Sequence, residues 1–265
     1  MTPLISPTPL IQAFIIRSTG WIVLNRPERR NSLNAEMWAA IPPLMKSIDD
    51  HADVRAIVIR GAGPEAFASG ADISEFDQAR NDAAAAARYE RLNGEAFAAI
   101  RGASKPVIAC IQGFCIGGGL AIALACDLRV ADRSAVFALP PARLGLAYPL
   151  DGLRDLAAAI GPSAAKQMIF TARRLKAEEA LRIGLIDRVA ENIEEETDTL
   201  CVDIAQGAPL SILHAKRALD FITGRPGHEL DAEINSHAAR CFDSEDYTEG
   251  RKAFAEKRKP VFKGK

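Results

Sequence analysis

A strand, a run of glycines and an apolar helix follow one another directly, and this arrangement constrains the fold more than any other segment. Residues 105–112 (KPVIACIQ) form a β-rich apolar run, and residues 115–127 (CIGGGLAIALACD) place three glycines before an apolar stretch. The first N–H groups of such a helix have no partner within it, so its N-terminus is an anion-binding site. Leu120, Ala121 and Ile122 carry no acid, base or nucleophile. The segment can therefore stabilise negative charge but cannot transfer a proton.

The rest of the chain alternates strands and helices, which predicts an α/β fold. Two β-rich runs, 11–17 and 21–25, flank Ser18-Thr19-Gly20 and predict a hairpin. Asn34 is expected to cap a helix over 35–49 that Pro42-Pro43 should kink or divide.

Further elements follow from hydrophobic periodicity. Strands are expected at 54–60, 105–112, 127–131 and 135–139, and helices at 83–100, 153–160, 163–171, 176–183 and 193–206. The composition becomes helical after Pro140-Pro141. We therefore expect an α/β core over residues 1–200 and a helical C-terminal region over 201–265.

Composition excludes several classes of protein. The chain has 265 residues, 48% of them apolar, and a net charge of −1, which argues against disorder and against nucleic-acid binding. Residues 1–10 lack a basic signal-peptide start, and no apolar run has the length of a membrane span. The five cysteines lack C-x-x-C spacing and the four histidines form no metal-ligand pattern. We expect a cytoplasmic protein with reduced thiols and without a metal site.

Two loops that follow buried strands are candidates for one shared site. The strand at 54–60 leads to 64–76 (PEAFASGADISEF), and the strand at 105–112 leads to 113–119 (GFCIGGG). Parallel strands would place one N–H from each loop against a single oxygen, as in an oxyanion hole. Tight helix–sheet packing at the glycine turn is the alternative interpretation of the triple glycine.

Several motifs in order carry a family resemblance. They are residues 25–34 (NRPERRNSLN), 67–72 (FASGAD), 113–119, 126–127 (CD), 177–189 (AEEALRIGLIDRV) and 253–260 (AFAEKRKP). With these motifs the chain resembles the enoyl-CoA hydratase/isomerase (crotonase) superfamily over nearly its whole length.

The resemblance implies a fold and a chemistry. The fold would be a crotonase-like spiral of ββα units followed by a helical trimerisation region, assembled as a homotrimer or homohexamer. The substrate would be an acyl-CoA thioester, and coenzyme A would be part of that substrate rather than a permanently bound cofactor. The catalytic N–H groups that stabilise a thioester enolate would belong to Ala71 and Gly118.

The resemblance also implies residues that bind coenzyme A. Ala68, together with Gly70, Ala71, Asp72 and Ile73, would border the adenine and pantetheine. Arg29 would lie near the phosphates, with Arg26 and Arg30 as alternatives. Phe254 and Lys257 would approach the adenine end, often that of a neighbouring subunit; a solvated charged tail is the alternative for residues 251–265.

The chain departs from the family pattern where hydratases carry two glutamates. Ala121 and Pro141 stand at the matching positions, and Pro149 stands where some members carry another carboxylate. None of these side chains exchanges a proton, so the ordinary hydratase mechanism, which needs an acid and a base, is not expected.

Two polar residues remain in the following segment. Tyr148 is a candidate catalytic residue, and a packed aromatic is its alternative role; Asp151 is expected to cap a helix. Tyr148 and residues 243–250 resemble the methylmalonyl-CoA decarboxylase branch, although those enzymes have a histidine where this chain has Ala71. Decarboxylation generates an enolate without a base, which favours a decarboxylase-type lyase.

Two alternatives stay open. The first is an enoyl-CoA hydratase or isomerase with an unusual acid–base group, for which Asp151, Asp72 and Glu75 are the candidates. The second is a non-catalytic acyl-CoA-binding hexamer.

Overall fold

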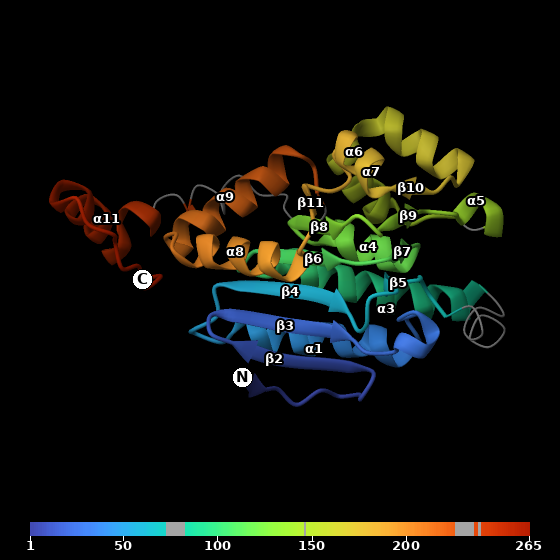
Figure 1. The fold of residues 1–265 in the computed structure, drawn as a ribbon, viewed down its shortest axis with the longest axis horizontal. Coiled ribbons are helices and arrows are strands. Elements are labelled where there is room, and N and C mark those ends of the chain that lie inside the picture. Colours follow the sequence, from blue (N-terminus) through green and yellow to red (C-terminus); the bar gives the residue numbers. More distant parts are fainter. Residues whose placement is uncertain (73–82, 146, 226–235, 238–239) are drawn as a thin grey trace.

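Two β-sheets form the centre of the chain (Figure 1). The computed structural model describes residues 1–72, 83–145, 147–225, 236–237 and 240–265. Among these, the larger sheet has seven strands in the order β1 (Thr2–Pro3), β2 (Ile11–Ile16), β3 (Thr19–Leu24), β4 (Ala56–Gly61), β6 (Val107–Ile111), β8 (Leu128–Asp132) and β11 (Arg188–Ala190). The smaller sheet has four strands in the order β10 (Leu175–Lys176), β9 (Val136–Ala138), β7 (Phe114–Ile116) and β5 (Ala66–Ala68).

Helices follow the strands in a repeated order. They are the 3₁₀ helix η1 (Pro27–Arg29), α1 (Ala35–Asp49), α3 (Ala83–Gly102), α4 (Gly118–Ala125), α5 (Pro141–Leu144), α6 (Leu150–Thr171), α7 (Ala177–Arg182), α8 (Ile193–Ala205), α9 (Pro209–Ile222) and α11 (Glu245–Glu256). The units β4-β5-α3, β6-β7-α4 and β8-β9-α5 each give one strand to the larger sheet and one to the smaller sheet before a helix. This repetition is the predicted spiral of ββα units.

The parallel pairings follow from this spiral. β3, β4, β6 and β8 are parallel neighbours in the larger sheet, and β5, β7 and β9 are parallel neighbours in the smaller one. Strands at corresponding positions of successive turns therefore end on the same side. In Figure 1, β5, β7 and α4 lie on the right, whereas α11 lies at the far left.

The hairpin and the first helix confirm the sequence prediction. β2 and β3 pair antiparallel from Ile11–Leu24 to Ile16–Thr19. The turn between them is Arg17-Ser18, so the predicted turn residues Thr19 and Gly20 belong to β3 instead. Asn34 caps α1, because its side chain accepts a hydrogen bond of 3.0 Å from Met37 N. Pro42 and Pro43 do not divide α1, because its buried apolar face packs into the core and offsets the loss of backbone hydrogen bonds.

Two further sequence predictions need correction. The short strands β5 and β7 lie in segments that the sequence suggested were loops. Pro149 occupies the N-cap of α6, so Asp151 lies inside the first turn and the capping role predicted for it is wrong. Its side chain is 55% exposed and lies 3.7 Å from Arg154 in an ion pair.

In the part of the chain that the structure describes, no helix combines the length and the apolar character needed to cross a membrane.

The cysteines are free thiols, and four of the five are buried. Burial raises the pKa of Cys201 from 9.0 to about 11, although a hydrogen bond with Thr19 opposes this shift. Burial likewise raises the pKa of Cys126 to about 12. The folded chain therefore keeps protons that the unfolded chain releases near pH 9.

This retention predicts a loss of stability at alkaline pH. Between pH 9 and 11 the unfolded state binds fewer protons, so the free energy of unfolding should fall by about 1.4 kcal/mol per pH unit for each such thiol. Urea unfolding of Cys201→Ala should show a shallower slope with pH than the wild type. Cys241→Ala is the control, since this thiol is not enclosed in the core; equal slopes in all three proteins would contradict the prediction.

Candidate active site

The backbone nitrogens of Ala71 and Gly118 come together where β5 and β7 end. A Cβ built on Gly118 would lie 3.5 Å from Ala71 N, and a Cβ built on Gly70 would lie 3.7 Å from Gly118 N. β5 and β7 are parallel neighbours, so the segments that follow them leave the smaller sheet on the same side. The two donors that the sequence predicts from separate loops are therefore neighbours in the fold.

The direction of the Ala71 N–H is fixed by the segment beside it. Leu33 forms a parallel bridge with Ala71: Leu33 N donates to Gly70 O at 2.8 Å, and Asp72 N donates to Leu33 O at 2.8 Å. In this parallel bridge, Leu33 bonds to Gly70 and Asp72, the residues on either side of Ala71. The N–H of Ala71 itself therefore points away from Leu33. Among the described residues, no hydrogen-bond acceptor is recorded for the N–H of Ala71 or of Gly118.

Glycine is required for the close approach of these segments. A Cβ on Gly119 would lie 2.4 Å from Ala68 O, so any larger residue would push α4 away from β5. Gly70 and Gly117 adopt φ values of 107° and 53°, which side chains disfavour. The predicted packing role of the glycines and the predicted donor role are thus both compatible with the geometry.

The residues at the expected glutamate positions are enclosed and apolar. Ala121 is 6% exposed in the first turn of α4, and its N–H donates to Gly117 O at 2.9 Å. Pro141 is buried at the start of α5. Neither side chain can act as an acid or a base.

Tyr148 precedes α6 and packs against the core. Its hydroxyl oxygen is buried and has no hydrogen-bond partner among the residues that the structure describes. Its ring lies over Gly152, where a Cβ would come within 2.6 Å of Tyr148 Cε1. Burial, with a smaller contribution from the charge of Asp155, raises the pKa of Tyr148 above its usual range. The phenol is therefore neutral and can donate a hydrogen bond.

The three candidate arginines have different environments. Arg26 Nη1 forms an ion pair of 2.5 Å with Asp72, and both side chains are largely buried. The Arg30 guanidinium lies 5.1 Å from the ring centroid of Phe114. Arg29 ends η1 with an exposed side chain that makes no recorded contact with the described residues. Arg26 and Asp72 thus neutralise each other, and Arg29 is available to a ligand.

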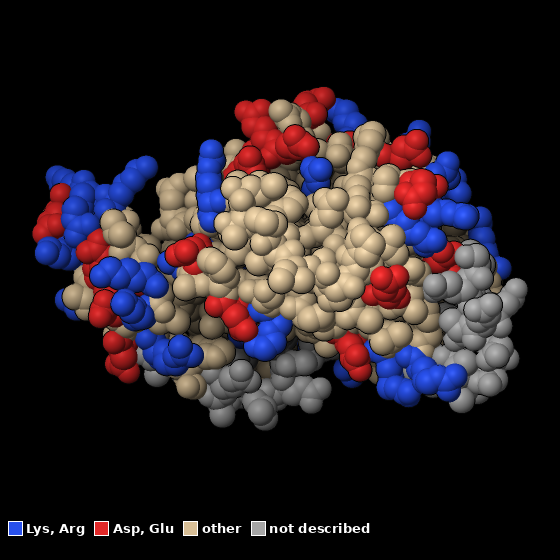
Figure 2. Space-filling model, turned by 90° about the horizontal axis from the view of Figure 1, so that it is seen from below, with Lys and Arg blue, Asp and Glu red and all other residues tan. Residues whose placement is uncertain are grey.

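The C-terminal candidates lie apart from the paired nitrogens within one chain. Phe254 on α11 is 88% exposed, and Lys257 follows the end of that helix. Figure 1 places α11 at the opposite end of the molecule from β5, β7 and α4. In Figure 2 this end carries many Lys and Arg side chains with a few acidic ones. A role for Phe254 and Lys257 in binding coenzyme A requires a neighbouring subunit.

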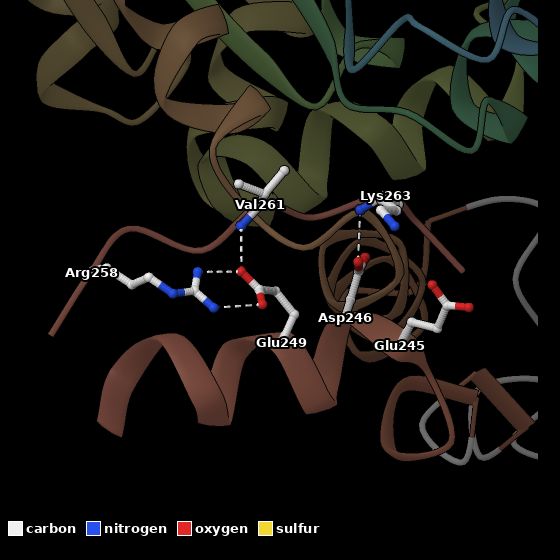
Figure 3. A pocket seen from close by; sticks show the side chains of 6 residues that line it. All are labelled: Glu245, Asp246, Glu249, Arg258, Val261 and Lys263. Carbon is white, nitrogen blue, oxygen red and sulfur yellow. Dashed lines mark hydrogen bonds and ion pairs between the residues drawn. The ribbon is translucent and has the colours of Figure 1, made fainter. Parts of the chain in front are cut away.

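A recess of about 290 Å³ between α11 and the chain end is occupied by internal bonds (Figure 3). Glu249 pairs with Arg258 at 2.6 Å and 2.9 Å, and accepts from Val261 N at 2.9 Å. Arg258 and the Val261 N–H lower the pKa of Glu249 to about 2. Asp246 accepts from the backbone N–H of Lys263. These groups fold the tail onto α11 and do not form the predicted site.

Two sequence candidates, Ile73 and Glu75, lie outside the described residues. The sequence did not reveal that Asp72 would pair with Arg26, because the two residues belong to separate motifs and the sequence does not show how close the motifs lie in space. It also did not indicate Trp38, which lies against Gly118. Among the described residues, no group of three His, Cys, Asp or Glu side chains could hold a metal ion.

The spiral fold and the near-full-length matches to named relatives define an enzyme class that acts on acyl-CoA thioesters. The family model for enoyl-CoA hydratase/isomerase matches residues 16–265, so the chain belongs to this family.

Named relatives cover nearly the whole chain. It is 34% identical to the short-chain-enoyl-CoA hydratase of Clostridium acetobutylicum, covering 90% of this chain and 91% of the relative. It is 36% identical to the (E)-benzylidenesuccinyl-CoA hydratase of Thauera aromatica, covering 92% and 95%. The crystal structure of a putative enoyl-CoA hydratase/isomerase family protein from Hyphomonas neptunium is 41% identical, with a TM-score of 0.90 and coverage of 97% and 98%.

Breaking the Arg26–Asp72 ion pair should destabilise the fold. Asp72→Ala leaves a largely buried guanidinium with only the exposed carboxylate of Glu28 at 4.0 Å and the oxygens of Ser32 as partners. This loss should lower the free energy of unfolding by about 2 kcal/mol in urea. Glu65→Ala is the matched control, because Glu65 and Arg30 form an exposed pair at 3.8 Å. That control should change stability by less than about 0.5 kcal/mol. Equal losses of stability in the two variants would show that the buried pair stabilises the fold no more than the exposed pair does.

Proposed function

We propose that this enzyme stabilises the enolate of an acyl-CoA thioester between the N–H groups of Ala71 and Gly118. The observation that supports this proposal is the convergence of the two nitrogens around one position, at the start of a buried helix. Paired donors of this kind stabilise negative charge that develops in the transition state. Helix α4 contributes the positive end of its dipole at the same point.

The reaction we propose first is decarboxylation. Loss of CO₂ from a malonyl-type thioester breaks the bond between the α-carbon and the carboxylate, and its electrons form the enolate. No base is needed for this step, which agrees with Ala121 and Pro141 at the positions where the family resemblance expects glutamates. A proton then returns to the α-carbon. The neutral hydroxyl of Tyr148 would orient the carboxylate or help to deliver that proton.

The second candidate is hydration or isomerisation of an enoyl-CoA. The names of the relatives favour it, since both curated relatives described above are hydratases. Hydration needs an acid–base group from elsewhere in the chain. The ion pair with Arg26 occupies Asp72, and Asp151 is the remaining described candidate.

We also propose that the enzyme works as a homotrimer or homohexamer. Several large apolar side chains on α6, α9 and α11 are exposed in the single chain, including Phe170 at 72%, Ile222 at 74% and Phe254 at 88%. A neighbouring subunit would cover such residues and would bring Phe254 and Lys257 to a bound coenzyme A. The buried free thiols support a reducing compartment such as the cytoplasm.

Assays with two substrates separate the candidate reactions. The wild type should release CO₂ from methylmalonyl-CoA or malonyl-CoA and should add little water to crotonyl-CoA. Tyr148→Phe should lower the rate of CO₂ release by about 10- to 100-fold, because it removes one hydrogen bond to the reacting groups. Tyr247→Phe, on the distant helix α11, is the control.

Rapid hydration of crotonyl-CoA without CO₂ release would contradict the first candidate and support the second. Tight binding of several acyl-CoA thioesters with no turnover would leave acyl-CoA binding as the function.

Arg29 should contribute to binding of the phosphates of coenzyme A. Arg29→Ala should raise KM for an acyl-CoA by about 5- to 20-fold, as expected for the loss of one charge-assisted contact. It should leave kcat/KM unchanged for the matching N-acetylcysteamine thioester, which lacks the phosphates. Arg17→Ala, another exposed arginine, is the control. An equal loss with both thioesters would show that Arg29 acts on the fold rather than on the phosphates.

A further inference from the structure

A buried tryptophan lies against the first residue of α4. Trp38 on α1 is fully buried, and a Cβ built on Gly118 would lie 3.0 Å from its Cζ2 and 3.3 Å from its Cη2. The same Cβ would lie 3.5 Å from Ala71 N. The outer ring of the indole, Gly118 and the Ala71 nitrogen therefore meet at one point.

Hydrogen bonds connect the same indole to the segment that holds Ala71. Trp38 Nε1 donates to the Tyr89 hydroxyl at 3.1 Å, and that hydroxyl donates to Leu33 O at 3.4 Å. Leu33 O also accepts the N–H of Asp72, and Leu33 N donates to Gly70 O. The chain of bonds thus runs from the ring that contacts Gly118 to the residues on either side of Ala71.

The indole has little freedom to move. Its ring meets the ring of Phe97 edge-on, with centroids 5.4 Å apart and planes at 80°. Tyr89 is 3% exposed and Leu33 is fully buried, so no solvent replaces the bonds between them. A buried and connected polar network of this kind fixes a single arrangement of the groups that it joins.

We propose that Trp38 and Tyr89 are positioning residues, which together set the separation and direction of the N–H groups of Ala71 and Gly118. This inference rests on the proposed enolate-binding role of those two groups. Trp38 limits how closely Gly118 approaches from α4, while Tyr89 holds Leu33 and, through it, the backbone around Ala71. Without these contacts, the distance between the two N–H groups would vary, because they lie on different segments of the chain.

Positioning matters because an oxyanion hole tolerates only small changes in the positions of its hydrogen-bond donors. Donors stabilise a developing oxyanion when they lie about 2.7 to 3.1 Å from it. A displacement of about 1 Å can reduce a rate about 100-fold. Neither Trp38 nor Tyr89 needs to touch the substrate to have this effect.

Tyr89→Phe tests the hydrogen-bonded connection with the smallest change. It removes one hydroxyl and keeps the ring in the core. We expect kcat to fall by about 10-fold, while KM changes by less than about 2-fold because the contacts to coenzyme A remain. Trp21→Phe is the control: this tryptophan on β3 stacks on Phe14, with ring centroids 6.3 Å apart.

A size exchange tests the contact itself. Gly118→Ala should lose most activity, since its Cβ meets the indole. Trp38→Phe removes the outer ring at that place, so the double variant Trp38→Phe/Gly118→Ala should recover at least 5-fold over Gly118→Ala alone. Such recovery measures the coupling between the two positions. Trp38→Phe also removes the hydrogen bond to Tyr89, so the single variant Trp38→Phe is measured alongside and should itself lose activity. A double variant no better than Gly118→Ala, with Trp38→Phe as active as the wild type, would overturn the role of Trp38.

A spectroscopic readout distinguishes this inference from the proposed function. Cinnamoyl-CoA and crotonyl-CoA absorb at longer wavelength when hydrogen bonds polarise the thioester carbonyl. The wild type should shift the absorbance of at least one of them, and Tyr89→Phe should reduce the shift at saturating ligand. If the wild type shifts neither, the proposed function fails. If the wild type shifts one and Tyr89→Phe preserves both the shift and kcat, the function stands and the positioning role is overturned.

Discussion

The two ends of helix α4 are held in opposite ways, and the arrangement of the site depends on this difference. Residues Gly119–Ala125 are all buried, so the polar groups at both helix ends need partners. At the C-terminal end, Leu124 O and Ala125 O accept hydrogen bonds of 3.1 Å and 2.9 Å from Arg225. At the N-terminal end, the Gly118 N–H has no recorded acceptor among the described residues. The fold therefore satisfies the C-terminal end of the helix and provides no recorded acceptor, among the described residues, for the Gly118 N–H at the other end.

A cluster of buried charges makes the C-terminal end possible. Arg225 lies 2.9 Å from Asp220, 3.4 Å from Asp155 and 3.6 Å from Asp127. A buried guanidinium without such partners would be strongly unfavourable. Lys216 on α9 adds an ion pair of 2.8 Å with Asp127. The division of the chain at residue 200 stays a prediction, but Lys216 on α9 and Arg225, three residues after its end, support the helix on which Gly118 lies.

Much of the fold could be predicted from the sequence because strong local signals coincide with the elements. The hairpin and the Asn34 cap have local signals in the sequence, although the hairpin turn lies at Arg17-Ser18 rather than at the predicted Ser18-Thr19-Gly20. β5 and β7 could not be predicted, because strands of three residues carry little periodicity and depend on their neighbours in the sheet. The wrong role for Asp151 has a similar cause, since the backbone geometry of Pro149 decides where α6 begins.

Only the part of the candidate site that consists of backbone N–H groups could be predicted from the sequence. The glycine run and the parallel strands indicated two loops that meet, and the family resemblance assigned the donors to the Ala71 and Gly118 nitrogens, which lie close together in the structure. The sequence did not distinguish Trp38, because an apolar residue on the core-facing side of a helix is common. Its contact with Gly118 arises from three-dimensional packing. The pairing of Arg26 with Asp72 has the same origin.

The place of Trp38 has an optical consequence. The chain contains two tryptophans, and Trp21 belongs to a different hydrophobic cluster from Trp38. In a Trp21→Phe background, all tryptophan emission would come from the indole that contacts Gly118. A thioester carbonyl bound beside that indole would change its emission, so the protein contains its own fluorescent probe of site occupancy.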